Sequence, residues 1–222
     1  MKKLFTGLVS LFLLTITVQP LYSQTAPFYN DIQQFKKQDS STFPPKDAIL
    51  LVGSSSFTKW KDVQSYFPGY TIINRGFGGS VLPDVIRYAN DIIIPYQPKQ
   101  VIVYCGDNDL ASSDTITPAI VTDRFKQLFQ IIRSKLPAAT ITYVSIKPSP
   151  SRVRLMSKMT ETNTMIENFL KSQKNTSFID VFHPMLEVGN KPIPSIFLAD
   201  SLHMNAKGYA IWKKAMEPQL KK

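Results

Sequence analysis

The chain has 222 residues, of which 43% are hydrophobic and 19% charged, an ordinary composition for one globular domain with a sizeable core. Its formal net charge is +10, but the basic residues are scattered and show no aromatic-interleaved motif, which argues against a nucleic-acid partner. One cysteine and two histidines are too few for a structural zinc site.

The first residues have the organisation of an export signal. Lys2 and Lys3 precede a mostly apolar stretch, and the small residue Ser23 provides a cleavage site. That stretch spans about 15 residues, from Leu4 to Val18, short of the roughly 20 that a membrane-spanning helix needs. We therefore expect residues 1–23 to be a cleaved signal peptide and residues 24–222 to form one domain without an integral membrane segment. The expected location is the periplasm or the cell exterior.

Beyond the leader, apolar runs of strand length alternate with segments of helical spacing. The pattern predicts strands at 49–52, 70–73, 100–104, 140–146 and 177–182, and helices at 27–37, 82–94, 118–136, 156–171 and 205–221. Alternation of this kind is typical of a mostly parallel sheet with helices on both faces, connected by right-handed crossovers. The predicted fold class is therefore α/β, a three-layer α/β/α sandwich.

Polar and glycine-rich loops follow the first three predicted strands. These loops contain residues 54–56, 76–79 and 106–108. Because the carboxyl ends of parallel strands meet at one edge of a sheet, where ligands bind in open α/β folds, we expect the three loops to converge.

The residues in these loops suit acyl transfer. A nucleophilic serine needs a base to take its proton and donors to hold the developing oxyanion, and backbone N–H groups at glycines or an Asn amide can supply the donors. Near the C-terminus, Asp200 precedes His203 by three residues. This spacing allows the carboxylate to hold one imidazole nitrogen while the other faces a serine.

The order of these blocks resembles that of the GDSL, or SGNH, hydrolases, which include esterases, lipases, thioesterases and carbohydrate deacetylases. The similarity extends over roughly residues 48–212, and the blocks that carry it are Gly53-Ser54-Ser55, Asn74-Arg75-Gly76-Phe77-Gly78-Gly79, Gly106-Asp107-Asn108-Asp109 and Asp200-Ser201-Leu202-His203. The resemblance implies a flavodoxin-like, five-stranded parallel sheet of order 2-1-3-4-5. It also implies a catalytic set of Ser55, Asp200 and His203, an oxyanion hole made by Ser55, Gly79 and Asn108, and no metal or organic cofactor.

The first block departs from the family pattern. Ser54 stands where the family has an aspartate, which leaves three adjacent serines. The departure does not remove the carboxylate that pairs with the histidine. We take Ser55 as the nucleophile, with Ser54 or Ser56 as the alternatives.

A second Asp-x-x-His occurs at Asp180 and His183, with the same spacing as the first. Asp180 belongs to the end of the fifth predicted strand, and His183 is followed by Pro184 in the exit loop. We expect His183 to be structural or exposed and Asp180 to be a strand-end carboxylate.

Two further groups near the blocks have simpler interpretations than substrate binding. Phe57, Trp60 and Phe77 are expected to be core residues rather than pocket walls. Arg152 and Arg154 are expected in a solvated loop rather than on an anionic substrate.

Together these features predict a secreted serine esterase that hydrolyses carboxylic esters, with short acyl groups such as O-acetyl groups on carbohydrate, through an acyl-enzyme intermediate. Its partner would be a small-molecule, lipid or carbohydrate ester. The alternatives are a lysophospholipase or thioesterase-like lipase, and a catalytically weak carbohydrate- or lipid-binding protein on the same fold.

Overall fold

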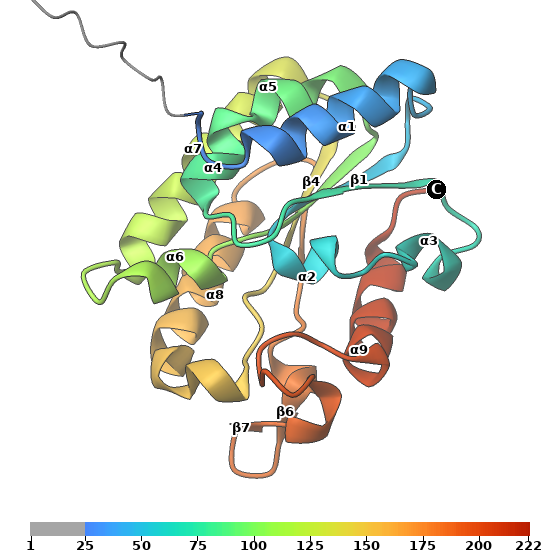
Figure 1. Cartoon of the computed structure of the whole chain (residues 1–222). Coiled ribbons are helices and arrows are strands. Elements are labelled where there is room, and N and C mark those ends of the chain that lie inside the picture. Colours follow the sequence, from blue (N-terminus) through green and yellow to red (C-terminus); the bar gives the residue numbers. More distant parts are fainter. Residues whose placement is uncertain (1–24) are drawn as a thin grey trace, which may run out of the picture.

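A five-stranded parallel sheet forms the centre of the computed structural model, which describes residues 25–222 (Figure 1). Its strands are β1 (Ile49–Gly53), β2 (Ile72–Gly76), β3 (Gln100–Tyr104), β4 (Thr140–Val144) and β5 (Thr176–Ile179). Their order is β2-β1-β3-β4-β5, with every neighbouring pair parallel, so the predicted topology is confirmed. The signal peptide expected at residues 1–23 lies outside the described residues.

Helices cover both faces of the sheet and complete the three layers. One face is covered by α1 (Tyr29–Ser41), α4 (Leu82–Arg87), α5 (Ala89–Ile92), α7 (Pro118–Lys135) and α8 (Met156–Lys171). The other is covered by α2 (Ser55–Thr58), α3 (Val63–Tyr66) and α9 (Ala206–Met216). A short helix, α6 (Asp107–Ser112), follows β3 directly.

The three inner strands, β1, β3 and β4, are mostly apolar because both of their faces are buried. Leu50 and Val52 of β1 pack into the core beneath α4, α5 and α7, whereas Ile49 and Leu51 point into the core beneath α2 and α9. Alternate residues of one strand thus serve the two cores, as the pleat of a strand requires.

Several of the predicted elements differ from the observed ones in their bounds; the strands predicted at 140–146 and 177–182, for example, are Thr140–Val144 and Thr176–Ile179. The helix predicted at 82–94 is divided into α4, α5 and a 3₁₀ turn at Ile94–Tyr96, and Pro95, which has no N–H, cannot continue an α-helix there. β2 ends at Gly76 instead of Ile73, because its polar residues Asn74 and Arg75 form a hydrogen bond and an ion pair. Asn74 bonds to the Phe57 carbonyl at 2.7 Å, and Arg75 pairs with Asp39 at 2.5 Å.

The C-terminal part also differs from the prediction. Helix α9 ends at Met216, and a 3₁₀ turn at Glu217–Gln219 follows it. A small antiparallel hairpin, β6 (Leu186–Glu187) and β7 (Lys191–Pro192), was not predicted. It lies on the lower side of Figure 1, with the loops that follow the strands.

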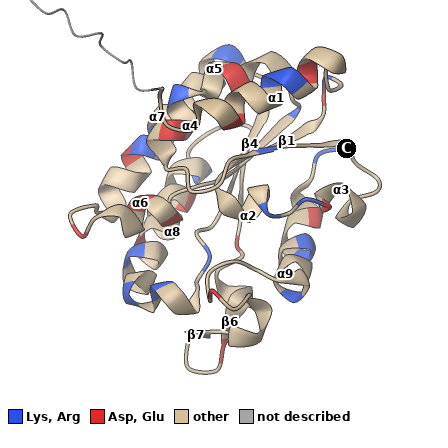
Figure 2. Cartoon of the chain, in the orientation of Figure 1, with Lys and Arg blue, Asp and Glu red and all other residues tan. Residues whose placement is uncertain are grey.

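Charged side chains of both signs are interspersed over the helices rather than gathered by sign (Figure 2). Within residues 25–222, none of the helices combines the length and the hydropathy needed to span a bilayer.

Candidate active site

The turn after β1 is built on a glycine that no other residue can replace without strain. Gly53 has φ +130°, and a Cβ atom there would lie 1.9 Å from the Tyr104 carbonyl oxygen of the neighbouring strand. The next residue, Ser54, donates its N–H to that same oxygen at 3.0 Å. β1 therefore runs close against β3 up to the turn, and α2 begins immediately afterwards at Ser55.

Ser55, His203 and Asp200 form a continuous chain of polar contacts. Nε2 of His203 lies 3.1 Å from Oγ of Ser55, and Nδ1 of His203 lies 2.6 Å from Oδ2 of Asp200. The Ser55 residue is partly exposed, and the His203 side chain is 18% exposed. The three residues predicted from the sequence as the catalytic set thus lie together, although Ser55 and His203 are 148 residues apart in the chain.

Asp200 is held in its ionised form by its own loop. Its carboxylate accepts hydrogen bonds from the side chain of His203 and from the backbone N–H groups of His203 and Leu202, and these bonds lower its pKa well below the usual value. A carboxylate that stays charged can fix the imidazole tautomer with the proton on Nδ1, which leaves Nε2 free to accept a proton.

Backbone bonds close the loop that carries this pair. The Leu198 N–H donates to the His203 carbonyl at 2.7 Å, and the Ser201 N–H donates to the Leu198 carbonyl at 2.9 Å. Directly after it, the side chain of Asn205 accepts from the N–H groups of Lys207 and Gly208 and so caps α9. The loop is thereby held in place at the N-terminal end of α9, one face of which is buried.

The geometry separates the three adjacent serines. Ser54 is buried, and its Oγ accepts a hydrogen bond from Asn108 at 2.7 Å. Ser56 is also buried, and its carbonyl accepts from the hydroxyl of Tyr209. Among the three, Ser55 is the one whose hydroxyl contacts His203.

The backbone N–H groups of Ser55 and Gly79, in the loops after β1 and β2, were predicted as oxyanion donors. Ser55 is the first residue of α2, where an N–H has no intrahelical acceptor, and Gly79 is exposed in the loop after β2 with φ +88°. Among residues 25–222, neither N–H donates a hydrogen bond to the protein. Phe28 packs against this loop. Its ring lies edge-on to that of Phe77, with 5.2 Å between the ring centroids, and is 4.0 Å from the position that a Cβ atom of Gly79 would take.

Asn108, the third predicted donor, is already engaged at both ends of its amide. Its Nδ2 donates to Ser54 Oγ at 2.7 Å and to the Ser80 carbonyl at 3.1 Å, while its Oδ1 accepts from Nη2 of Arg152 at 2.9 Å. The amide thus lies beside the serine turn, oriented by acceptors on one side and a donor on the other.

The expectation of a solvated Arg152 is wrong. Its side chain is only 17% exposed, and its Nη1 lies 2.5 Å from Oδ1 of Asp107. Buried Lys147, an unpredicted participant, lies 3.4 Å from the other oxygen of Asp107. Burial alone would raise the pKa of Asp107, but the two cations outweigh it and the pKa is lowered. Arg154, by contrast, is 63% exposed and pairs with Asp114, as expected of a solvated loop.

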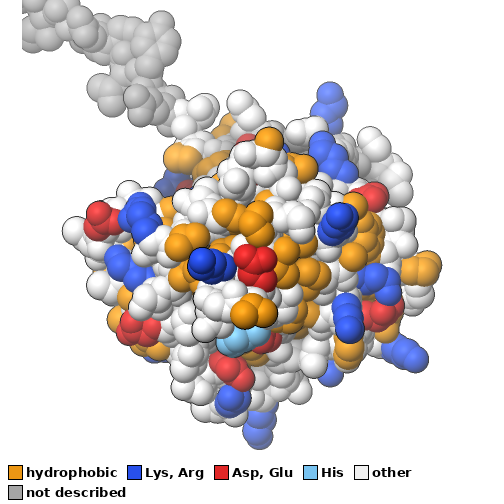
Figure 3. All heavy atoms as spheres, turned by 90° about the horizontal axis from the view of Figure 1, so that it is seen from below, with side chains coloured by type: hydrophobic (Ala, Val, Ile, Leu, Met, Phe, Trp, Pro, Cys, Tyr) orange, Lys and Arg blue, Asp and Glu red, His pale blue; other side chains and the backbone are white. Residues whose placement is uncertain are grey.

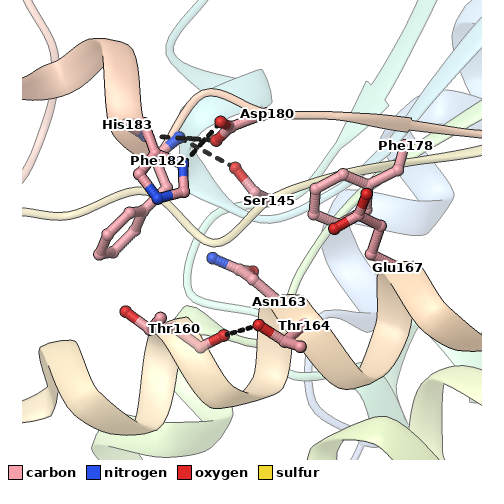
Figure 4. Close-up of a pocket in the computed structure, with 9 residues that line it drawn as sticks. All are labelled: Ser145, Thr160, Asn163, Thr164, Glu167, Phe178, Asp180, Phe182 and His183. Carbon is pink, nitrogen blue, oxygen red and sulfur yellow. Dashed lines mark hydrogen bonds and ion pairs between the residues drawn. The ribbon is translucent and has the colours of Figure 1, made fainter.

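The second pair, Asp180 and His183, reproduces the local geometry of the first. Nδ1 of His183 lies 2.7 Å from Oδ2 of Asp180, and Oδ1 of Asp180 accepts from the N–H groups of Phe182 and His183. The His183 side chain is 73% exposed, which confirms the prediction of an exposed residue. The pair borders a cavity of about 220 Å³ against α8, shown in Figure 4, and among residues 25–222 no serine hydroxyl bonds to this imidazole.

Several residues near the site prove to be core, as predicted. Phe57, Trp60 and Phe77 are fully buried. Cys105 is buried as well, and burial raises the pKa of its thiol well above the usual value, so it is not a reactive nucleophile. Within the described part of the chain, His, Cys, Asp and Glu side chains form no group of three or more that could hold a metal ion.

The surface seen from the lower side of Figure 1 mixes apolar side chains with a histidine and acidic groups (Figure 3). Val153 and Leu198 are each about half exposed, at 51% and 47%. Val153 follows Arg152 in the chain, and Leu198 belongs to the loop that carries Asp200. The segments that carry Arg152 and Asp200 therefore also expose apolar side chains.

Comparisons with known proteins identify the family and support the fold. The family model described as "GDSL-like Lipase/Acylhydrolase family" matches residues 39–211. No curated protein matches the sequence.

Solved structures share the fold at low sequence identity. A GDSL-like lipase from Bacteroides thetaiotaomicron superposes with a TM-score of 0.73 at 18% identity, over 85% of this chain and 96% of its own. A catalytic mutant of an acetylxylan esterase from Geobacillus stearothermophilus gives a TM-score of 0.60 at 15% identity, over 79% of this chain and 94% of its own. The chain belongs to the GDSL-like lipase/acylhydrolase family, whose members are ester-hydrolysing enzymes.

Proposed function

We propose that the protein is an exported serine esterase that hydrolyses short-chain carboxylic esters, such as O-acetyl groups on carbohydrate, through an acyl-enzyme. The observation that carries the proposal is the contact chain from Ser55 Oγ through His203 to Asp200, at 3.1 and 2.6 Å. These distances lie within or close to hydrogen-bond reach before substrate binds, as the pairing of a nucleophile with its base requires.

In the first half-reaction, Ser55 Oγ attacks the ester carbonyl while Nε2 of His203 takes the hydroxyl proton. Asp200, kept ionised by hydrogen bonds from the His203 side chain and from two backbone N–H groups, stabilises the imidazolium that forms. The same Nε2 then gives the proton to the departing alcohol, which leaves the acyl group on Ser55. In the second half-reaction, water gives a proton to His203 and attacks the acyl-enzyme, and the acid is released.

The tetrahedral oxyanion is held by the N–H groups of Ser55 and Gly79 and by the Asn108 amide. The Asn108 N–H that now bonds to Ser54 Oγ exchanges this acceptor for the oxyanion. The exchange is favourable because a hydrogen bond to an ionised acceptor is roughly twice as strong as one to a neutral hydroxyl.

The substrate class rests on three supports. The structural similarity to an acetylxylan esterase favours acetyl esters of carbohydrate. The sequence contains no long apolar insertion between its motif blocks that would cover a long acyl tail, which favours short acyl groups over those of a lipase. The leader pattern at residues 1–23 favours export.

A fluorophosphonate probe tests the proposal, because it labels only an activated serine. Wild-type protein is expected to be labelled and to hydrolyse p-nitrophenyl acetate, and Ser55→Ala is expected to lose both properties while it keeps its circular dichroism spectrum. Ser54→Ala and Ser56→Ala are expected to be labelled. Wild type that takes no label would make the protein a binding module on this fold, and labelled Ser55→Ala would move the nucleophile.

A further inference from the structure

Arg152 bridges two consecutive residues of the loop after β3. Its Nη1 contacts the Asp107 carboxylate at 2.5 Å and its Nη2 donates to the Asn108 amide oxygen at 2.9 Å. A planar guanidinium suits this task because its donors project in a rigid fork, whereas an ammonium offers only a point charge. One side chain therefore fixes the position of both residues.

The partners of Asn108 determine which way its amide faces. An arginine can only donate, so the atom that faces Arg152 has to be Oδ1. A backbone carbonyl can only accept, so the atom that faces Ser80 has to be Nδ2. With Arg152 in place, the amide N–H groups point toward Ser80 and Ser54, on the side of the nucleophile turn.

The charges around Asp107 strengthen this arrangement. Asp107 is buried and contacts two basic side chains, Lys147 and Arg152. A positive charge on the oxygen side of an amide polarises its N–H groups and makes them better donors. Arg152, which donates to Oδ1, places such a charge on the oxygen side of the Asn108 amide.

The segment that carries Arg152 also contacts the loop of the catalytic histidine. It forms a 3₁₀ turn, Pro150–Leu155, in which Arg152 itself departs from helical geometry with φ −123° and ψ 24°. The N–H of Ser151 donates to the carbonyl of Ser201 at 3.1 Å, within the Asp200–His203 loop. This one short segment therefore touches both the oxyanion donor and the loop of the base.

We propose that Arg152 is a positioning residue of the esterase, which holds the Asn108 amide with its N–H groups turned toward Ser54 and the nucleophile. The inference rests on the proposed function, since it assigns Arg152 a role in that reaction. It differs from a substrate-binding role, because the guanidinium acts through Asn108 and not on the ester itself.

A double-mutant cycle tests the coupling. Arg152→Ala is expected to lower kcat on p-nitrophenyl acetate by about ten- to a hundredfold, with KM little changed. This factor corresponds to the free energy of one hydrogen bond to a charged group. In an Asn108→Ala background the same change is expected to cost less than about threefold, because the group it positions is gone. Arg152→Lys is expected to restore only part of the loss, since one ammonium cannot form both bonds.

Arg154→Ala is the matched control. It removes the same charge two residues away, where the side chain is 63% exposed and pairs with Asp114, and kcat is expected to stay at the wild-type level. A full-sized loss for Arg152→Ala in the Asn108→Ala background would overturn the inference. So would a loss confined to KM, which would indicate that Arg152 binds substrate directly.

A second readout needs no turnover. The side-chain ¹⁵N–¹H₂ resonances of Asn108, assigned by their absence in Asn108→Ala, are expected to shift and to exchange faster with solvent in Arg152→Ala but not in Arg154→Ala. Unchanged resonances in Arg152→Ala would overturn the positioning role. An inactive wild type in which these resonances still shift in Arg152→Ala would overturn the proposed esterase alone, so the two failures are distinguishable.

Discussion

The two Asp-x-x-His pairs provide an internal control for the proposed base. Each imidazole contacts its carboxylate through Nδ1, at 2.6 Å in His203 and 2.7 Å in His183, and each aspartate accepts two backbone N–H groups. The pairs differ at Nε2, which in His203 lies 3.1 Å from Ser55 Oγ. Changing each histidine to asparagine therefore makes the same local substitution at two places, of which only one adjoins the nucleophile.

The expected effects differ by several orders of magnitude. His203→Asn is expected to lower kcat by about 10⁴- to 10⁶-fold, the range found when the base or its orienting carboxylate is lost from a triad. His183→Asn is expected to keep kcat within about twofold, since no proton-transfer step uses it. Both variants lose one contact to a carboxylate, so both melting temperatures should fall by no more than about 4 °C.

Initial rates on p-nitrophenyl acetate, together with melting curves followed by circular dichroism, measure both quantities. The melting curves confirm that a loss of turnover is not a loss of fold. If His183→Asn were the inactive variant, the catalytic pair would be Asp180 and His183, and the alignment of the last motif block would be wrong. If both variants kept full turnover, no imidazole would act as the base.

Four further outcomes are expected. Asn108→Ala should lower kcat by about 10²- to 10³-fold with little change in melting temperature, as removal of one oxyanion donor does, whereas a lower melting temperature with intact kcat would make Asn108 structural. Hydrogen bonds from His203 and from two backbone N–H groups hold the pKa of Asp200 below its ordinary value, so protonation of this carboxylate should add nothing to the loss of kcat/KM between about pH 7 and about pH 4; a slope near 2 in log kcat/KM against pH would show that Asp200 also titrates. In a series of p-nitrophenyl esters, turnover should be fastest with acetate and fall toward octanoate, and a maximum at octanoate or beyond would favour the lipase. Gly53→Ala should destabilise the fold by about 3 kcal/mol or more in denaturant titrations, because Gly53 has a positive φ and lies close to the Tyr104 carbonyl. Gly69→Ala is the control, since nothing lies within 4 Å of a Cβ there, and equal stabilities of the two variants would show that β1 and β3 can separate.

The sheet could be predicted because its three inner strands, β1, β3 and β4, are short, mostly apolar runs that are buried on both faces. Such runs are recognisable without knowledge of their neighbours, and the alternation with helical segments then indicates parallel pairing. The end of β2 was missed because Asn74 and Arg75 interrupt the apolar run. Their partners, Phe57 and Asp39, lie 17 and 36 residues earlier in the chain, and local pattern does not report such contacts.

Within the site, the position of each loop was easier to predict than the contacts of its side chains. Convergence of the loops after β1, β2 and β3 follows from parallel topology alone. The choice among three serines does not, since it depends on which hydroxyl faces His203 and which accepts from Asn108. Arg152 was misjudged for a similar reason: an arginine in a proline-rich loop carries no local sign of burial, and its partners, Asp107 and Asn108, follow a different strand.

The packing of Phe28 behind the Gly79 loop has a practical consequence for how the protein is prepared. The Phe28 ring lies against Phe77, and the hydroxyl of Tyr88 donates to the carbonyl of Pro27 at 2.7 Å, so the start of the described chain is part of the wall beside the site. A recombinant form that lacks Pro27 and Phe28 would lose this part of the wall. A bulky affinity tag fused directly before Pro27 would press on it. Either version could depress measured turnover with every proposed catalytic residue intact, so activity is best compared in protein that begins at residue 24 with its tag removed.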